Sequence, residues 1–334
     1  MRRVVTLLLL LSQLLGATMI KVATYNVENL FDLEKSGHEY KEYIPYSKSQ
    51  WNKKNYTIKL RNIARVIKDI NADIIALQEI ESLQALKDLR FTLKRQGLYY
   101  PYFKIANYKK TTVKVAILSK IPFVYTHEIA VQSSYRYRNI LEAKFRVDGE
   151  DFFVLVNHWK AKSGAESMRV VSAKKLLKRC NELGDNQNII VLGDFNSHYE
   201  ENITFKRKRK LNDTGGITGI NDILATKYYK RVAAQTELEK DAFYNLWYDT
   251  PESQRYSYIY RRKKEALDSI LISKSLLDKR GMEYKKGSIS NFHPPYVFKG
   301  KGIYRWQVSR KRVKVHRGKG YSDHLAVSAV FLTN

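Results

Sequence analysis

The chain has 334 residues, of which 60 are Lys or Arg and 33 are Asp or Glu, so its formal net charge is +27. Its single cysteine, Cys180, excludes an internal disulfide framework. Beyond the N-terminal stretch no segment is apolar enough to span a membrane, and no linker, repeat or low-complexity tract divides the chain. These features predict a single folded domain with an ordinary hydrophobic core.

The first 18 residues have the layout of a secretory signal peptide. Two arginines precede an apolar stretch from Val4 to Leu15, and small residues follow at positions 16–18. The apolar stretch is shorter than the roughly 20 residues that span a bilayer, which disfavours a membrane anchor. We therefore expect an exported protein, periplasmic or secreted, whose mature domain is 19–334.

Hydrophobic patterning predicts alternating strands and helices along the mature chain. In chain order these are a strand at 20–25, a helix at 57–70, a strand ending at Glu79, a helix at 83–94, strands at 113–118, 139–147 and 151–157, a helix at 167–180, and strands at 188–193, 257–261, 267–272 and 326–332. Asp148 and Gly149 suit a hairpin turn, and 197–246 reads as mixed helix and loop. This order fits two packed sheets flanked by helices.

Six of the apolar runs bring a metal-ligand or acid–base side chain to one of their ends. The polar residues follow the run in four segments and precede it in two, which gives the set Asn26, Glu79, His158, Asp194, Asn196, Asp268, Asp323 and His324. If the last two strands run antiparallel to neighbours among the first four, strand starts and strand ends meet at one edge of a sheet. The pattern then predicts a site for a hard metal ion with acid–base partners.

The residue types suggest how the metal side of this site is built. A carboxylate delivered by a buried strand, such as Glu79, is a usual Mg²⁺ ligand, and Asn26 can add a neutral carbonyl oxygen. Adjacent residues on an extended segment point in opposite directions. We therefore expect Asp323 to touch the metal while Asp268 holds the imidazole of His324. For Glu79 alone, a charged strand end in water is the alternative.

The remaining residues of the set suggest a place for water and phosphate. Gly193 lets the backbone turn, so that Asp194 and Asn196 project to the same side and can hold a water and a phosphate oxygen. An Asx turn would use the same residues. His158 offers a second imidazole for the opposite side of a phosphodiester. Surface or loop positions are expected for the other histidines, His38, His127, His198, His293 and His316.

The charge predicts a polyanionic partner. Without the signal peptide, 58 basic residues remain against 33 acidic ones, a net charge of about +25 that attracts polyanions. Basic clusters at 206–210, 261–264 and 299–319, with tyrosines at 256, 258 and 260, suit a groove for a phosphate backbone, although a generally cationic surface is the alternative. We expect nucleic acid, most readily DNA, no stable membrane association and a monomer. The expected substrate contacts are Lys206, Arg207, Arg261 and Arg262.

Six motifs resemble those of a known superfamily. TYNVENLFD, DIIALQEIE, NHWKAKSGAES, VLGDFNS, ALDSILIS and YSDHLAV, in that order, are similar to the endonuclease/exonuclease/phosphatase superfamily typified by deoxyribonuclease I, and VENLFD with NHWKAKSGAES resembles its exported bacterial nuclease-like members. The resemblance covers nearly the whole mature chain. It implies a four-layer α/β/β/α sandwich of two mostly antiparallel sheets flanked by helices. It also implies phosphodiester hydrolysis with Mg²⁺ or Mn²⁺.

The resemblance also implies a role for each matching residue. Asn26, Glu79 and Asp323 are metal-side residues, Asp194 and Asn196 position water and phosphate, His324 held by Asp268 is the base, and His158 is the acid. Arg138 falls where such nucleases place a phosphate-contacting arginine. Two departures stand out: 108–120 has no acidic residue to support His158, and Ser269 follows Asp268 where bulkier polar residues are frequent.

The expected activity is that of an exported, metal-dependent, sequence-nonspecific DNA endonuclease. The first alternative is the same catalytic site acting on RNA, or on a phospholipid or phosphoinositide phosphoester. Membrane-acting branches need an apolar docking loop, whereas the candidate long loops here are cationic. The second alternative is a non-catalytic DNA-binding or toxin-like module.

Overall fold

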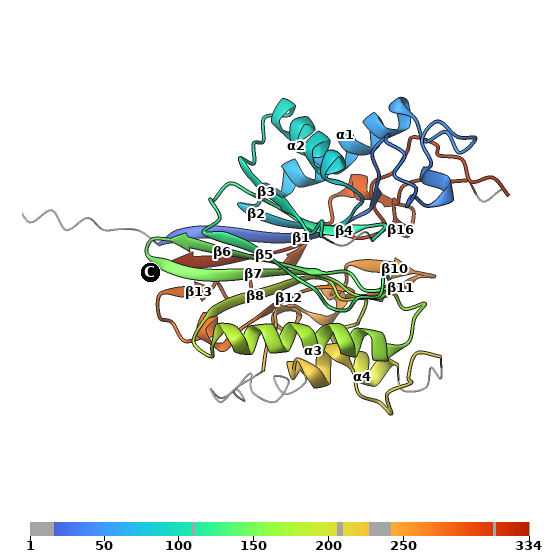
Figure 1. The fold of residues 1–334 in the computed structure, drawn as a ribbon. Helices are drawn as coiled ribbons and strands as arrows, with labels where there is room; N and C mark the ends of the chain where they lie inside the picture. Colours follow the sequence, from blue (N-terminus) through green and yellow to red (C-terminus); the bar gives the residue numbers. More distant parts are fainter. Residues whose placement is uncertain (1–16, 109–110, 206–209, 227–241, 310–311, 334) are drawn as a thin grey trace, which may run out of the picture.

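Two β-sheets lie face to face between two layers of helices (Figure 1). The computed structural model describes residues 17–108, 111–205, 210–226, 242–309 and 312–333. Residues 1–16 of the expected signal peptide, and the expected contacts Lys206 and Arg207, lie outside this description. The arrangement confirms the predicted α/β/β/α sandwich, with two parallel strand pairs within otherwise antiparallel sheets.

The first sheet has β1 near its centre. The strand order is β13 (Met282–Tyr284), β17 (Val327–Thr333), β1 (Thr18–Leu30), β2 (Ile74–Ile80), β4 (Lys114–Ser119) and β3 (Tyr102–Ile105), and β14 (Ser290–Asn291) also pairs with β17. β1 is antiparallel to β17 and parallel to β2. The ends of β1 and β2 therefore meet the start of β17, as the sequence pattern required.

The second sheet also has a central strand with one parallel and one antiparallel neighbour. Its order is β5 (Tyr125–Ile129), β6 (Ile140–Val147), β7 (Glu150–His158), β8 (Asn188–Asp194), β12 (Asp268–Ile272) and β9 (Tyr244–Asn245). β7 is parallel to β8, and β12 is antiparallel to β8. The expected turn joins β6 to β7, because Asp148 and Gly149 both have left-handed backbones with φ of 51° and 86°.

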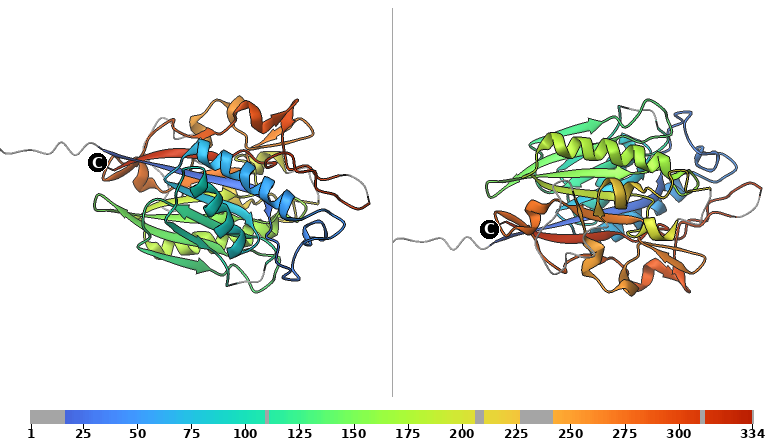
Figure 2. Two further views of the ribbon diagram at one scale, coloured as in Figure 1. Left: turned by 90° about the horizontal axis from the view of Figure 1, so that it is seen from above. Right: turned by 90° about the horizontal axis from the view of Figure 1, so that it is seen from below.

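The helices cover the outer faces of the two sheets. α1 (Lys53–Ile70) and α2 (Leu83–Arg95) lie on the first sheet, and α3 (Glu166–Leu183) and α4 (Glu201–Thr204) lie on the second (Figure 2). α1 begins four residues before its predicted start, because the Asn52 side chain caps it by accepting from the backbone N–H of Asn55. Ser82 caps α2 in the same way.

Short elements complete the chain. They are the two-stranded ribbons β10 (Tyr258–Tyr260) with β11 (Lys263–Glu265) and β15 (Phe298–Lys299) with β16 (Gly302–Ile303), a π turn at Gly219–Ile223, and 3-10 turns at Lys41–Tyr43, Leu246–Asp249, Glu252–Gln254, Lys274–Leu277 and Pro295–Val297. The region 197–246 is mixed helix and loop as expected, although 227–241 lies outside the described residues.

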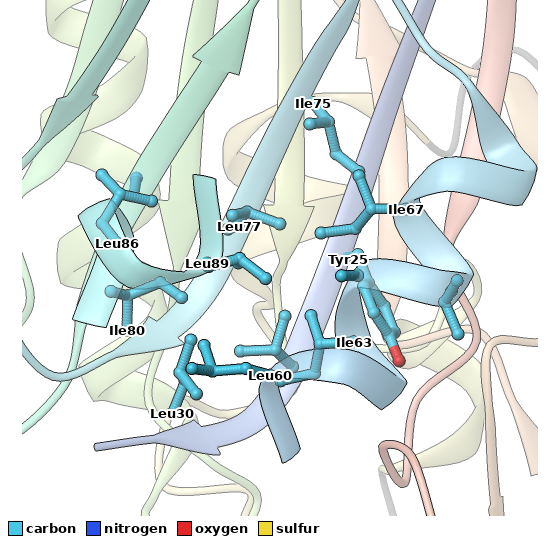
Figure 3. Close-up of a cluster of buried hydrophobic side chains, with 14 of the residues drawn as sticks. Tyr25, Leu30, Leu60, Ile63, Ile67, Ile75, Leu77, Ile80, Leu86 and Leu89 are labelled. Carbon is cyan, nitrogen blue, oxygen red and sulfur yellow. The ribbon is translucent and has the colours of Figure 1, made fainter. Parts of the chain in front are cut away.

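Apolar side chains fill the space between each pair of layers. Between the first sheet and its helices lie Leu60, Ile63 and Ile67 of α1, Leu86 and Leu89 of α2, and Tyr25, Leu30, Ile75, Leu77 and Ile80 of the strands (Figure 3). A second cluster lies between the sheets, and a third between α3 and the second sheet. Central strands are therefore buried on both faces, which explains their nearly continuous apolar runs.

Gly193 is fixed by a close approach between strands rather than by the turn that its position suggested. It lies within β8 opposite Asn157, and its φ is 140°. A Cβ atom added there would lie 2.0 Å from the backbone oxygen of Asn157. Only glycine therefore lets β7 and β8 align their ends at His158 and Asp194.

We predict that Gly193→Ala destabilises the protein by roughly 2–4 kcal/mol, because the two strands must separate to admit the methyl group. Urea unfolding followed by circular dichroism measures the change. Gly302→Ala is the matched control, because a Cβ there meets open space, and it should cost less than about 0.5 kcal/mol. Equal unfolding midpoints for the two variants would contradict this account of Gly193.

Candidate active site

The ends of β1, β2, β7 and β8 bring four polar side chains together. Asn26 Nδ2 donates to Glu79 Oε1 at 3.2 Å and to Asp194 Oδ2 at 3.0 Å. His158 Nε2 lies 3.7 Å from Glu79 Oε1 and 3.6 Å from Asp194 Oδ2. Asn26 and Glu79 belong to the first sheet, and His158 and Asp194 to the second. The cluster therefore spans the interface between the sheets.

Glu79 reaches this cluster through an irregularity in β2. The pairing of β2 with β4 shifts between Gln78 and Ile80, and Glu79 has a left-handed backbone with φ of 68°. Such a conformation costs a residue other than glycine about 1–3 kcal/mol and is found most often at functional sites. The bulge frees Glu79 from the alternation of the strand and lets its carboxylate face Asn26.

An aspartate–histidine pair completes the site. His324 Nδ1 lies 2.6 Å from Asp268 Oδ2, as the sequence predicted, and both side chains are buried. Asp268 lies directly opposite Asp194 across β12 and β8. His324 Nε2 lies 4.0 Å from Asp194 Oδ2 and 4.0 Å from Asp323 Oδ1. One oxygen of Asp194 is therefore close to both His158 and His324.

The pKa values of the two imidazoles are shifted in opposite directions. Burial lowers the pKa of His324, but the charges of Asp268 and Asp194 outweigh burial and hold it well above its usual value. The pKa of His158 is held well below its usual value by burial and by the charges of Arg138 and His324. The acid–base assignment that the resemblance implies stays a prediction.

No acidic side chain described in the structure supports the His158 ring from its Nδ1 side. Within the described part of the chain, His158 Nδ1 has no hydrogen-bond partner. The stretch 108–120, of which 109–110 is not described, supplies none. The ring is instead held by its position at the end of β7, beside the backbone hydrogen bond from Trp159 N to Asp194 O.

Asn196 and Arg138 converge on one carbonyl group. Asn196 Nδ2 and Arg138 Nη1 donate to the backbone oxygen of Trp159 at 3.3 and 3.1 Å. Asp194 Oδ1 accepts from the backbone N–H of Asn196 at 2.8 Å, so the expected Asx turn is present. This turn places Asn196 beside the Asp194 carboxylate, and the two interpretations of these residues are therefore compatible.

A charged network next to Asp323 was not predicted from the sequence. The exposed Arg305 donates from Nε to Oε1 of the buried Glu28 at 2.8 Å, and Arg305 Nη2 lies 3.1 Å from Asp323 Oδ2. Burial and the charge of Asp323 raise the pKa of Glu28 to about 7, although the positive charges of Lys59 and Arg305 act to lower it. Lys59 is buried, donates to the backbone oxygen of Glu28 at 2.7 Å, and has its pKa lowered by burial to about 8. Glu28 follows Asn26 by two residues, a spacing that could have indicated it, whereas nothing local indicates Arg305.

The hairpin of β10 and β11 borders the site. The Tyr258 ring lies 4.9 Å from the His324 ring, and the two residues form an isolated β-bridge. Arg261 and Arg262 lie exposed in the turn between β10 and β11, with left-handed backbones. Their expected contact with substrate stays a prediction.

The other histidines are only partly where the sequence placed them. His38, His127 and His293 are exposed. His198 is half-buried, and its Nδ1 accepts from the backbone N–H of Ala266 at 3.2 Å. His316 lies in an irregular segment between β16 and β17, as a loop position requires, but its side chain is not at the surface, because it is buried within an aromatic cluster.

The residues present fit a divalent cation. Asp194, Asp268 and His324 offer ligand atoms within 4.8 Å of one another, and Asp268 Oδ1 has no hydrogen-bond partner among the described residues. Burial and the charge of Asp323 raise the pKa of Glu79. Carboxylates withdrawn from water and facing one another are stabilised by a cation with oxygen preference. The group of Asp194, Asp268 and His324 includes the Asp268–His324 pair. The expected metal-side residues Asn26, Glu79 and Asp323 lie beside this group.

Comparison with known families agrees with this geometry. A family model described as "Endonuclease/Exonuclease/phosphatase family" matches residues 21–231, which include the first four of the six segments. The chain belongs to this family. Members of the endonuclease/exonuclease/phosphatase family are typically metal-dependent phosphoesterases, in keeping with the acidic cluster.

Solved structures of this family share the fold over almost the whole chain. D. rerio TDP2 complexed with single strand DNA product is 14% identical, with a TM-score of 0.58 over 94% of this chain and 99% of that one. A family protein from Bacteroides thetaiotaomicron is 15% identical (TM-score 0.57, 96% and 99%). A mannosyl-6-phosphatase from B. thetaiotaomicron VPI-5482 is 16% identical (TM-score 0.57, 94% and 100%). No curated protein matches the chain by sequence.

Every helix within the described residues is too short or too polar to cross a bilayer.

We predict that Asp268→Asn lowers stability in a pH-dependent way. Because the native pKa of His324 lies above its unfolded value of about 6.5, the ion pair stabilises the fold fully below pH 6.5 and less as pH rises through the native pKa. The loss should be about 1–3 kcal/mol at acidic pH and should shrink at alkaline pH.

Urea unfolding in EDTA at several pH values measures this change. Asp278→Asn, at an exposed aspartate, is the control and should unfold like the unsubstituted protein. A loss for Asp268→Asn that is the same at every pH would contradict the role of His324 ionisation.

Proposed function

We propose that this member of the endonuclease/exonuclease/phosphatase family is an exported, Mg²⁺-dependent phosphodiesterase that cleaves DNA as a sequence-nonspecific endonuclease. The observation that supports the chemistry best is the pair of imidazoles beside Asp194. His158 Nε2 and His324 Nε2 lie 3.6 and 4.0 Å from the same Asp194 oxygen, and their pKa values are shifted in opposite directions. A phosphodiester bound there has a proton acceptor and a proton donor within reach.

The residues of this chain divide the reaction between them. One imidazole accepts the proton of the attacking water and the other donates to the leaving oxygen, each contributing roughly 10²–10⁴ in rate. Asp194 and Asn196 position the water and a phosphoryl oxygen, and Arg138 lies where it can contact the phosphate. Glu79 and Asp323, with Asn26, would hold the cation, which neutralises charge on the phosphoryl oxygens when bound.

Charge favours nucleic acid as the substrate. A net charge of about +25 on the mature chain attracts polyanions at long range. The hairpin beside His324 presents Arg261 and Arg262 to solvent. A protein of the same fold, D. rerio TDP2, was solved with a single strand DNA product. Export rests on the signal-like pattern of residues 1–18, and we expect the mature protein to act as a monomer.

We predict that the mature protein nicks supercoiled plasmid with Mg²⁺ and that EDTA abolishes this activity. His158→Ala and His324→Ala should each reduce nicking by at least about 10²-fold while DNA affinity, measured in EDTA by fluorescence anisotropy, changes little. His127→Ala, at an exposed histidine, is the control.

Retained nicking in His158→Ala or His324→Ala would refute the site assignment. An intact plasmid together with cleavage of RNA or of a phospholipid would keep the site and change the substrate.

We predict that Arg261→Asn with Arg262→Asn weakens DNA binding and its dependence on salt. Asparagine is chosen because both positions have left-handed backbones, which it tolerates. The slope of log Kd against log salt concentration should fall by about 0.9 for each lost contact with duplex DNA. The control is Lys279→Asn with Arg280→Asn, two exposed cations after β12, of which Lys279 also has a left-handed backbone. An unchanged slope in the hairpin variant would place Arg261 and Arg262 off the binding surface.

A further inference from the structure

A groove lies beside the catalytic cluster and has no role in the chemistry described so far. Its volume is about 960 Å³, and its walls come from residues 39–49 on one side and 312–314 on the other. These two segments are far apart in the sequence but lie together at one end of the molecule, where Figure 2 shows the blue loop after β1 next to the red segment before β17. None of the catalytic carboxylates or imidazoles lines the groove.

The groove adjoins the active site at two residues. Asn29, which lines it, follows Glu28, the partner of Arg305 beside Asp323. Tyr40, also in the lining, makes a side-chain hydrogen bond with Arg138, and the charge of Glu79 affects its pKa. A chain extending from a phosphate at the catalytic cluster can therefore pass Tyr40 and enter the groove.

The groove presents uncompensated positive charge. Lys41, Lys48 and Arg312 are exposed and form no ion pair with any residue that the structure describes. Of the acidic residues nearby, Glu42 pairs with Lys314 at 2.6 Å. Glu39 accepts hydrogen bonds from the backbone N–H groups of residues 36 and 37. The three free cations are thus available to an anionic ligand.

A buried histidine joins the two walls. His316 Nδ1 accepts from Trp306 Nε1 at 2.8 Å, and His316 Nε2 donates to the backbone oxygen of Glu42 at 2.8 Å. The backbone N–H of His316 donates to Ser49 O at 2.9 Å. Burial lowers the pKa of His316 to about 4, so the neutral ring that this arrangement requires is present at neutral pH. The groove is therefore formed before any ligand binds, which reduces the ordering cost of binding.

We propose that this groove binds the stretch of a nucleic-acid strand that flanks the scissile phosphate, with backbone phosphates on Lys41, Lys48 and Arg312. This assignment rests on the proposed function, because it extends the substrate away from the catalytic cluster. Repeated phosphates match three separate cations better than one headgroup does. Tyr40, 38% exposed at the entrance, offers a face on which a base can stack.

The test compares Lys48→Ala with Arg312→Ala, as a double variant, against the charge-matched control Lys174→Ala with Lys178→Ala on the exposed side of α3. Fluorescence anisotropy in EDTA measures binding of single-stranded DNA of about 12 nucleotides and of about 3 nucleotides. The groove variant should bind the long strand roughly tenfold more weakly, and its salt slope should fall by about 1.4 for two lost contacts. Its affinity for the short strand, and both affinities of the control, should stay within about twofold.

Hydrolysis separates this proposal from the proposed function. With Mg²⁺, the groove variant should keep kcat and KM for bis(p-nitrophenyl) phosphate, while its KM for the long strand rises. A wild-type protein that hydrolyses neither substrate would refute the proposed function, and the binding measurement in EDTA would still decide the groove. Equal affinity of the groove variant and its control for the long strand would overturn the groove assignment. Lost binding to anionic vesicles with unchanged DNA binding would also overturn it.

Discussion

Two buried hydrogen bonds hold the active site across the interface between the sheets. Asn26 of the first sheet donates to Asp194 of the second, and His324, which precedes β17 of the first sheet, pairs with Asp268 of the second. Bonds to charged groups in a low-dielectric interior are strong when made and costly when one partner is removed. The relative position of the sheets and the geometry of the site therefore depend on the same contacts.

The opposite pKa shifts of His158 and His324 follow from the charges that surround two buried rings. Burial alone would lower the pKa of both. His324 Nδ1 lies 2.6 Å from Asp268 Oδ2, and the charges of Asp268 and Asp194 raise its pKa. The carboxylate oxygens near His158 Nε2 are 3.6 and 3.7 Å away, and the charges of Arg138 and His324 add to burial in lowering its pKa.

Much of the site could be predicted because strand register determines it. Once β12 pairs antiparallel with β8, Asp268 must lie opposite Asp194, and both are visible in the sequence as polar ends of apolar runs. The contacts of Arg305 and His316 could not be predicted, since both residues lie in an irregular segment before β17 and their partners Glu28 and Glu42 are more than 270 residues away in the sequence. The left-handed backbone of Glu79 could not be predicted either, because an apolar run does not reveal a bulge.

The backbone of Glu79 shows which demand governs that position. Glycine or asparagine would adopt a φ of 68° at lower cost, and neither would confine a carboxylate beside Asp194 and Asp323. A chain optimised for folding alone would favour one of those residues. The fold accepts a local energetic loss at the end of β2 and compensates for it with the apolar contacts of Leu77 and Ile80 on either side. Under the proposed function, stability and activity make opposite demands on position 79, and we expect a more stable variant at this position to be an inactive one.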